Sequence, residues 1–126
     1  WLHEQDMRRA VDRPGNMSGP SAEHTVDRLI RTIPIVVGKR AATPEGAAVV
    51  IDIEGPVQRH LVYEVSGGRA GEVDTPTAQP LASIALDTED FVVLAAGRRG
   101  ADAVNARVEG DTELARRILT QFNMMI

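Results

Sequence analysis

The chain lacks cysteine and has few aromatic residues, and both shortages exclude classes of function. Without cysteine it has no disulfides, no thiolate metal ligands and no cysteine nucleophile. Aromatic side chains make up 3% of the 126 residues, too few for a surface that stacks nucleic-acid bases. Because 18 acidic residues outnumber 14 basic ones, a basic surface is not expected either, and we predict no nucleic-acid partner.

Long apolar runs are also missing, so no membrane span is expected, and no signal peptide is recognisable. A chain of 126 residues has room for one domain and the edge of a second. The absence of cysteine suits a reducing compartment. Together with a net charge of −4, these features predict a mildly acidic cytoplasmic protein.

The first twelve residues have the pattern of a helix. His3, Met7, Ala10 and Val11 recur at helical spacing and define one apolar face, which is expected to point inward. Charged residues cover most of the remaining surface of this helix. The segment RPGNMSGPS (residues 13–21) follows, and its two prolines and two glycines break regular structure. An organisational boundary is therefore expected near residue 20.

Beyond this boundary the pattern predicts helices and strands that segregate along the chain. Ser21 is expected to cap a helix whose apolar stripe reaches Val37 and which Pro34 kinks or ends. From Gly46 the apolar period changes to two, which is typical of strands. Strands are expected over residues 47–55, 59–65, 69–73, 81–87 and 104–109. One further helix is expected to begin at a cap at Asp87 or Thr88 and to end at Gly97. The last helix is expected to begin at the N-cap Asp111, with Leu114, Ile118 and Phe122 as its inward face.

Because helices and strands do not alternate strictly, the predicted fold class is α+β, with a mixed, mostly antiparallel five-stranded sheet and helices packed on it. This order of elements, with the phrases LDTEDFVVLAAGRR and ARVEGDTELARRIL, resembles the sterol carrier protein type 2-like fold. More specifically, it resembles the C-terminal domain of the mycothiol-dependent maleylpyruvate isomerase family of actinobacteria.

The opening WLHEQDMRRA is similar to the last long helix of that family's N-terminal DinB-like four-helix bundle. The resemblance implies two parts. Residues 1–20 would be the terminal helix and linker of an incomplete bundle, and residues 21–126 a C-terminal sterol carrier-like α+β domain. The chain is thus expected to be the C-terminal part of a longer protein.

The same resemblance implies a metal site in the bundle of the full-length parent. In that family a divalent metal, usually taken as zinc, is held by two histidines and by a Glu four residues before the second of them. His3 matches this second histidine, and the Glu would lie upstream of this sequence, so His3 alone cannot hold zinc. Taken by itself, a histidine on an apolar face also suits a structural role. Asp6 is expected to pair with Arg9 or Arg13.

Arg98 is the other candidate site residue. It directly follows Gly97, and the resemblance gives the arginine at this position a catalytic role. Arg99, the next residue, is the alternative match to the family's arginine. A guanidinium holds a carboxylate through two parallel hydrogen bonds, which suits a dicarboxylate substrate. The alternative is helix capping, because cations are favoured at a helix C-terminus. His24 and His60 lack partners at a useful spacing and are expected to be structural or solvent-facing.

Three functions remain open at this point. The first is the C-terminal portion of an isomerase or thiol transferase that uses zinc and mycothiol and acts on a small unsaturated dicarboxylate such as maleylpyruvate. Both cofactors are expected for the full-length parent only, the residues that bind mycothiol are unassigned, and this chain alone is expected to be inactive. The second is a module that binds a lipid or sterol in an apolar tunnel, with Met124 and Met125 at its lip. The third is a structural or dimerising domain.

Overall fold

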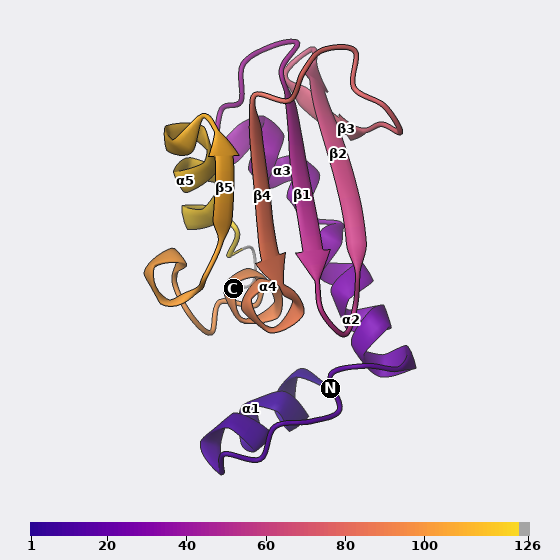
Figure 1. The fold of residues 1–126 in the computed structure, drawn as a ribbon, viewed down its shortest axis with the longest axis vertical. Coiled ribbons are helices and arrows are strands. Elements are labelled where there is room, and N and C mark those ends of the chain that lie inside the picture. The colour runs from indigo at the N-terminus through magenta and orange to yellow at the C-terminus, as the bar shows by residue number, and fades with distance from the viewer. Residues whose placement is uncertain (124–126) are drawn as a thin grey trace.

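Five strands form one sheet in the order β3-β2-β1-β4-β5 (Figure 1). The structure is a computed structural model and describes residues 1–123. β1 pairs antiparallel with β2 and parallel with β4, and the two outer pairs are antiparallel. The predicted mixed, mostly antiparallel sheet is thereby confirmed. The strands are β1 (Ala48–Glu54), β2 (Arg59–Ser66), β3 (Arg69–Glu72), β4 (Ala82–Asp87) and β5 (Arg107–Gly110).

The first long helix of the domain is shorter than predicted. It begins at Pro20 with Gly19 as its cap, so the predicted cap at Ser21 is wrong. The interruption expected from Pro34 is confirmed, because the chain leaves the helix after Ile30 and continues in short turns. The helices are α1 (Leu2–Ala10), α2 (Pro20–Ile30), α3 (Ile33–Ile35), the π-helical turn η1 (Val36–Arg40), α4 (Thr88–Ala95), the 3-10 turn η2 (Ala101–Ala103) and α5 (Thr112–Thr120).

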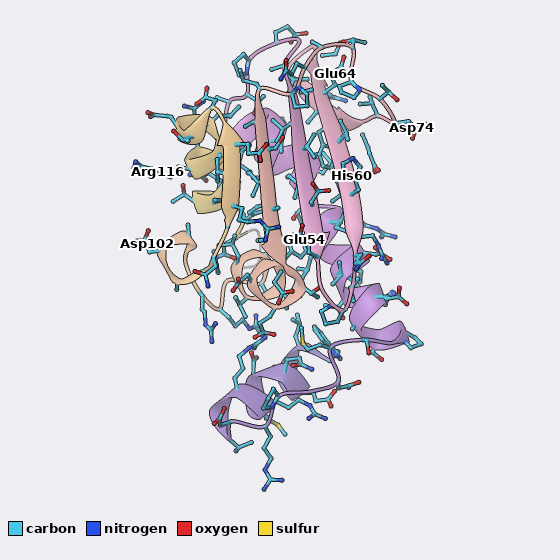
Figure 2. All side chains as sticks on the ribbon, in the orientation of Figure 1. Glu54, His60, Glu64, Asp74, Asp102 and Arg116 are labelled. Carbon is cyan, nitrogen blue, oxygen red and sulfur yellow. The ribbon has the colours of Figure 1, made fainter. Side chains whose placement is uncertain are left out.

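The alternation of side chains along the strands decides which face of the sheet is buried. On β1, Ile51 and Ile53 are buried against the helices, whereas Glu54 is exposed on the opposite face. In Figure 1, α2 and α3 lie behind the sheet. The labelled side chains of Glu54, His60 and Glu64 in Figure 2 belong to the uncovered face. The core therefore forms one layer between the sheet and the helices.

α4 is anchored at its start by a buried hydroxyl. Thr88 is fully buried, and its Oγ1 accepts a hydrogen bond from the Val57 N–H at 3.1 Å and lies 2.8 Å from the Glu54 carbonyl oxygen, to which it donates. The predicted cap falls at Asp87, whose side chain makes no capping hydrogen bond. Thr88 thus ties the β1–β2 connection to α4, which fixes where α4 leaves the end of the sheet.

The turn before the last helix is formed as the sequence predicted. Gly110 has a φ of +84°, and a Cβ there would lie 2.4 Å from the carbonyl oxygen of Leu81, so the position requires glycine. Asp111 caps α5 by accepting a hydrogen bond from the Leu114 N–H at 3.0 Å. The predicted inward face is confirmed, since its members Leu114, Ile118 and Phe122 are all fully buried.

The last strand starts later than the predicted range of residues 104–109. Residues 101–103 form the turn η2, and β5 begins only at Arg107. Val104 and Ala106 still pack against the core, as their alternation indicated, but they do so before the chain joins the sheet. The N–H of Asn105 donates to the Asp90 side chain at 3.3 Å, so this part of the backbone bonds to α4 and not to β4.

Along the described residues 1–123, no helix has the combination of length and apolar character needed to cross a bilayer. The prediction for Met124 and Met125 concerns residues outside the described range.

Candidate functional site

α1 contacts the rest of the chain through its polar face. Met7 and Val11 are 67% and 64% exposed, and His3 is exposed on the same side. The buried residue is Gln5, whose amide donates to two carbonyl oxygens of the following loop at 3.0 and 3.2 Å. The prediction that the His3–Met7–Ala10 face points inward is therefore wrong for this chain. The reason is that the surface opposite α1 carries charged side chains, which pair with the charged face of the helix.

Four charged side chains join α1 to α4, which Figure 1 places above it. Asp6 accepts two hydrogen bonds from the Arg98 guanidinium, at 3.0 Å from Nη2 and 3.3 Å from Nε. Arg9 pairs with the same carboxylate at 3.0 Å and with Glu89 at 2.6 Å. The predicted pairing of Asp6 with Arg9 is confirmed, but its link to Arg98 was not predicted. This network brings α1, which carries His3, close to Arg98 at the end of α4.

Arg98 occupies a fixed position just after α4. Gly97 has a φ of +75°, which ends the helix and turns the chain. The Nη1 of Arg98 donates to the Ala96 carbonyl oxygen at 2.8 Å, so the predicted contact with the helix end is present. A guanidinium has five N–H donors. Within residues 1–123, Asp6 and Ala96 engage three of them, which leaves one N–H on each of Nη1 and Nη2 for a ligand.

A cavity of about 500 Å³ lies between α1, α2 and the end of α4, and we call it the α1–α2 cavity. Both predicted site residues, His3 and Arg98, line it, although they come from distant parts of the sequence. None of the lining residues in the described part of the chain is acidic, and Arg28 and Arg98 are among them, so the cavity favours an anionic ligand. The other lining residues are Trp1, Leu2, His24, Thr25, Arg28, Leu29 and Thr32.

Sequence reasoning missed His24 and Arg28 as residues of this cavity. His24 is solvent-facing, as predicted, but the solvent it faces is that of the cavity. The four-residue spacing of the pair on α2 was the available signal, because it places both side chains on one helical face. His60, the third histidine, contacts Asp52 directly across the β1–β2 pair and lies away from this site.

The metal prediction for His3 can be compared with its surroundings. Within residues 1–123, no three His, Asp or Glu side chains are arranged so that they could hold a metal ion. A structural or catalytic zinc site needs at least three protein ligands. This part of the chain therefore gathers fewer than three candidate ligands around His3 and does not by itself fit a zinc site.

The contact between α1 and α4 depends on an ionised carboxylate. Hydrogen bonds from Arg98 hold the pKa of Asp6 below its ordinary value, with smaller opposing desolvation. A group whose pKa is lowered in the folded state stabilises that state above its unfolded pKa, about 3.9 for Asp, and ceases to do so as the pH falls through the lowered value. Acid below about pH 4 is therefore expected to weaken the attachment of α1.

Acid titration of Trp1 fluorescence tests this expectation. Trp1 is the single tryptophan and lines the α1–α2 cavity beside residues of α2, so its surroundings change when α1 detaches. We expect a fluorescence transition below about pH 4 in the wild type. Asp6→Asn lacks the carboxylate that binds Arg98, so its signal should already be shifted toward that of detached α1 at neutral pH, although the Arg9–Glu89 pair remains. Identical titration curves for the two proteins would contradict the assigned role of Asp6.

The sheet order and the helices gathered on one face place the chain in the sterol carrier protein 2-like class of α+β folds. Sterol Carrier Protein 2 Like 2 from Aedes aegypti matches with a TM-score of 0.56 at 14% identity, covering 76% of this chain and 94% of that one. Sterol carrier protein domain 2 of Helicoverpa armigera matches with a TM-score of 0.55 at 13% identity, covering 80% of this chain and 87% of that one. Sterol Carrier Protein 2 from Yarrowia lipolytica in its apo form matches with a TM-score of 0.51 at 15% identity, covering 85% of this chain and 99% of that one. At these identities the likeness establishes the fold alone.

The family described as the MDMPI C-terminal domain matches residues 23–117. The chain therefore belongs to this family of maleylpyruvate isomerase C-terminal domains, which confirms the predicted resemblance. The matched range contains Arg28 and Arg98 and excludes His3. A search of curated proteins gives no significant match.

Proposed function

We propose that the chain is the C-terminal portion of a zinc- and mycothiol-dependent isomerase or thiol transferase acting on a small unsaturated dicarboxylate such as maleylpyruvate. The observation that carries this proposal is that His3 and Arg98 line one cavity. Membership of the maleylpyruvate isomerase C-terminal domain family supports the reaction class. Zinc, mycothiol and the substrate follow from the family resemblance, and a thiol cofactor agrees with a cytoplasmic protein that has no cysteine of its own.

In this proposal Arg98 binds one carboxylate of the substrate. Its remaining N–H groups, on Nη1 and Nη2, are the donors that such a carboxylate would contact. Asp6 and the Ala96 carbonyl oxygen hold that guanidinium in place, so Asp6 is a positioning residue. His3, which lines the same cavity, would contribute one metal ligand, and the other ligands would come from residues outside this sequence.

The exposed apolar face of α1 supports the same proposal. A helix of a four-helix bundle turns its apolar residues and its metal ligands toward the other helices. Met7 and Val11 are exposed here beside His3, so this face is free to pack against further helices. We accordingly propose that residues 1–20 belong to the bundle and residues 21–126 to the C-terminal domain.

Zinc analysis of a longer protein tests the proposed metal ligand. An extended protein would carry roughly a hundred further upstream residues, enough to complete a four-helix bundle. We expect about one zinc per chain, and a fall to below roughly a tenth of that in His3→Ala because a catalytic site has only three protein ligands. His60→Ala is the matched control and should keep its zinc. Absence of zinc from the extended wild type, or its retention in His3→Ala, would contradict the proposal.

The alternative is an apolar ligand, which the sterol carrier-like fold suggests. In this chain, however, side chains such as Tyr63, Phe91 and Phe122 are fully buried within the core between sheet and helices. A lipid tunnel there would require these side chains to move. We therefore expect no saturable binding when the delipidated chain is titrated with a fluorescent fatty acid at micromolar concentration. Saturable, stoichiometric binding would favour the lipid-binding function over the enzyme.

A further inference from the structure

The α1–α2 cavity contains a second guanidinium that the proposed function leaves unused. Arg28 lies in its α2 wall, and Arg98 lines it from the end of α4. Arg98 is held by Asp6, whereas the Arg28 side chain has no hydrogen-bond or ion-pair partner among residues 1–123. An arginine in a cavity without an acidic partner is available to a ligand.

The acidic residues of α2 explain why Arg28 is available. Asp27 accepts two hydrogen bonds from the Arg59 side chain on β2, at 2.9 and 3.1 Å. Glu23 lies 3.7 Å from the same guanidinium. The acidic side of α2 is thus directed at Arg59 on the sheet, which pairs with both carboxylates. His24 and Arg28 line the cavity from α2, and Arg28 supplies the positive charge there.

The neighbouring hydroxyls show which groups in the α2 wall can donate to an anion. The Thr25 hydroxyl donates to the Ser21 carbonyl oxygen at 2.9 Å, and the Thr32 hydroxyl donates to the Leu29 carbonyl oxygen at 2.7 Å. Their protons are therefore committed to the helix. The side-chain donors that α2 offers to the cavity are those of Arg28 and His24.

We propose that Arg28, with His24 one helical turn away, is a second anion-binding element of the α1–α2 cavity and determines specificity for ligands with two anionic groups. Arg98 would hold one carboxylate and Arg28 the other. A ligand with a single carboxylate would leave one guanidinium without a partner. This assignment rests on the proposed function, because that function makes the α1–α2 cavity the substrate site.

Maleate and its monomethyl ester are suitable probes, because they share one carbon skeleton and differ in the number of carboxylates. Trp1 lines the cavity and is the single tryptophan, so its fluorescence reports binding to this chain. We expect the wild type to bind maleate about tenfold more tightly than the monoester. Arg28→Gln should lose this preference through weaker maleate binding, and Arg28→Lys should keep part of it.

Arg31→Gln is the matched control, since Arg31 is an exposed residue that directly follows α2 and does not line the cavity. It should bind both probes as the wild type does. The inference is overturned if the wild type does not prefer maleate, or if Arg28→Gln behaves like Arg31→Gln. Loss of binding in Arg98→Gln with none in Arg28→Gln would also overturn it but leave the proposed function standing. If the extended protein bound no zinc, the proposed function would be contradicted. A maleate preference that depends on Arg28 would still support the second anion-binding element.

Discussion

Replacing Arg98 by Gln in the zinc-loaded extended protein is expected to lower kcat/KM for maleylpyruvate on the order of a hundredfold. The substitution removes the charge and the forked geometry that, in the proposed function, bind a substrate carboxylate. Arg98→Lys keeps the charge but loses the fork, so it should recover only part of the activity. The measurement is steady-state kinetics at saturating mycothiol.

Two controls separate this effect from a structural one. Arg99 lines a different cavity, on the other side of α1 with Gln5 and Glu89, so Arg99→Gln should keep near wild-type activity. Because Arg98 also binds Asp6, zinc content and Trp1 fluorescence of Arg98→Gln must be compared with those of Asp6→Asn. If Arg98→Gln keeps wild-type kcat/KM, or Arg99→Gln loses as much, Arg98 is not the substrate-binding arginine.

Phe122→Ala is expected to destabilise the domain by about 3–5 kcal/mol, the largest effect on stability that we predict. Phe122 is fully buried after α5 and meets Phe91 of α4 edge-on, with ring centroids 6.0 Å apart and an interplanar angle of 87°. Truncation removes this contact and leaves a cavity between two helices that the sheet holds in place. Equilibrium unfolding in urea gives the free energy directly.

Phe122→Leu is the matched control, because it keeps much of the apolar volume while removing the ring. We expect it to cost clearly less than the alanine variant, roughly 1–2 kcal/mol. A loss below about 1 kcal/mol in Phe122→Ala would show that the end of α5 is not an integral part of the core.

The sequence predicted those parts of the fold that local chemistry determines. The period-two pattern located the central strands, and Gly97 and Gly110 marked two positions where a positive φ is required. The start of β5 was misplaced because Val104 and Ala106 alternate like a strand but pack before they join the sheet. An alternating apolar pattern indicates which side chains are buried, but it does not indicate whether the backbone pairs with another strand.

The candidate site was less predictable, because it depends on contacts between distant segments. Amphipathicity identified the apolar face of α1 correctly, but which face packs is decided by the partner, and here Asp6 and Arg9 meet charges on α4 and beyond it. The family resemblance alone connected His3 with Arg98. The sequence analysis did not consider Arg28, because its place in the cavity depends on how α2 packs against α1 and the end of α4.

The most direct measurement of the central claim is the conversion of maleylpyruvate by the extended protein, followed by ultraviolet absorbance with and without mycothiol. The proposed function predicts turnover that requires both bound zinc and mycothiol, that disappears in His3→Ala and that falls on the order of a hundredfold in Arg98→Gln. A folded, zinc-loaded protein that leaves maleylpyruvate unchanged in the presence of mycothiol would contradict that substrate and reaction. Turnover that is unaffected in both variants would contradict the site.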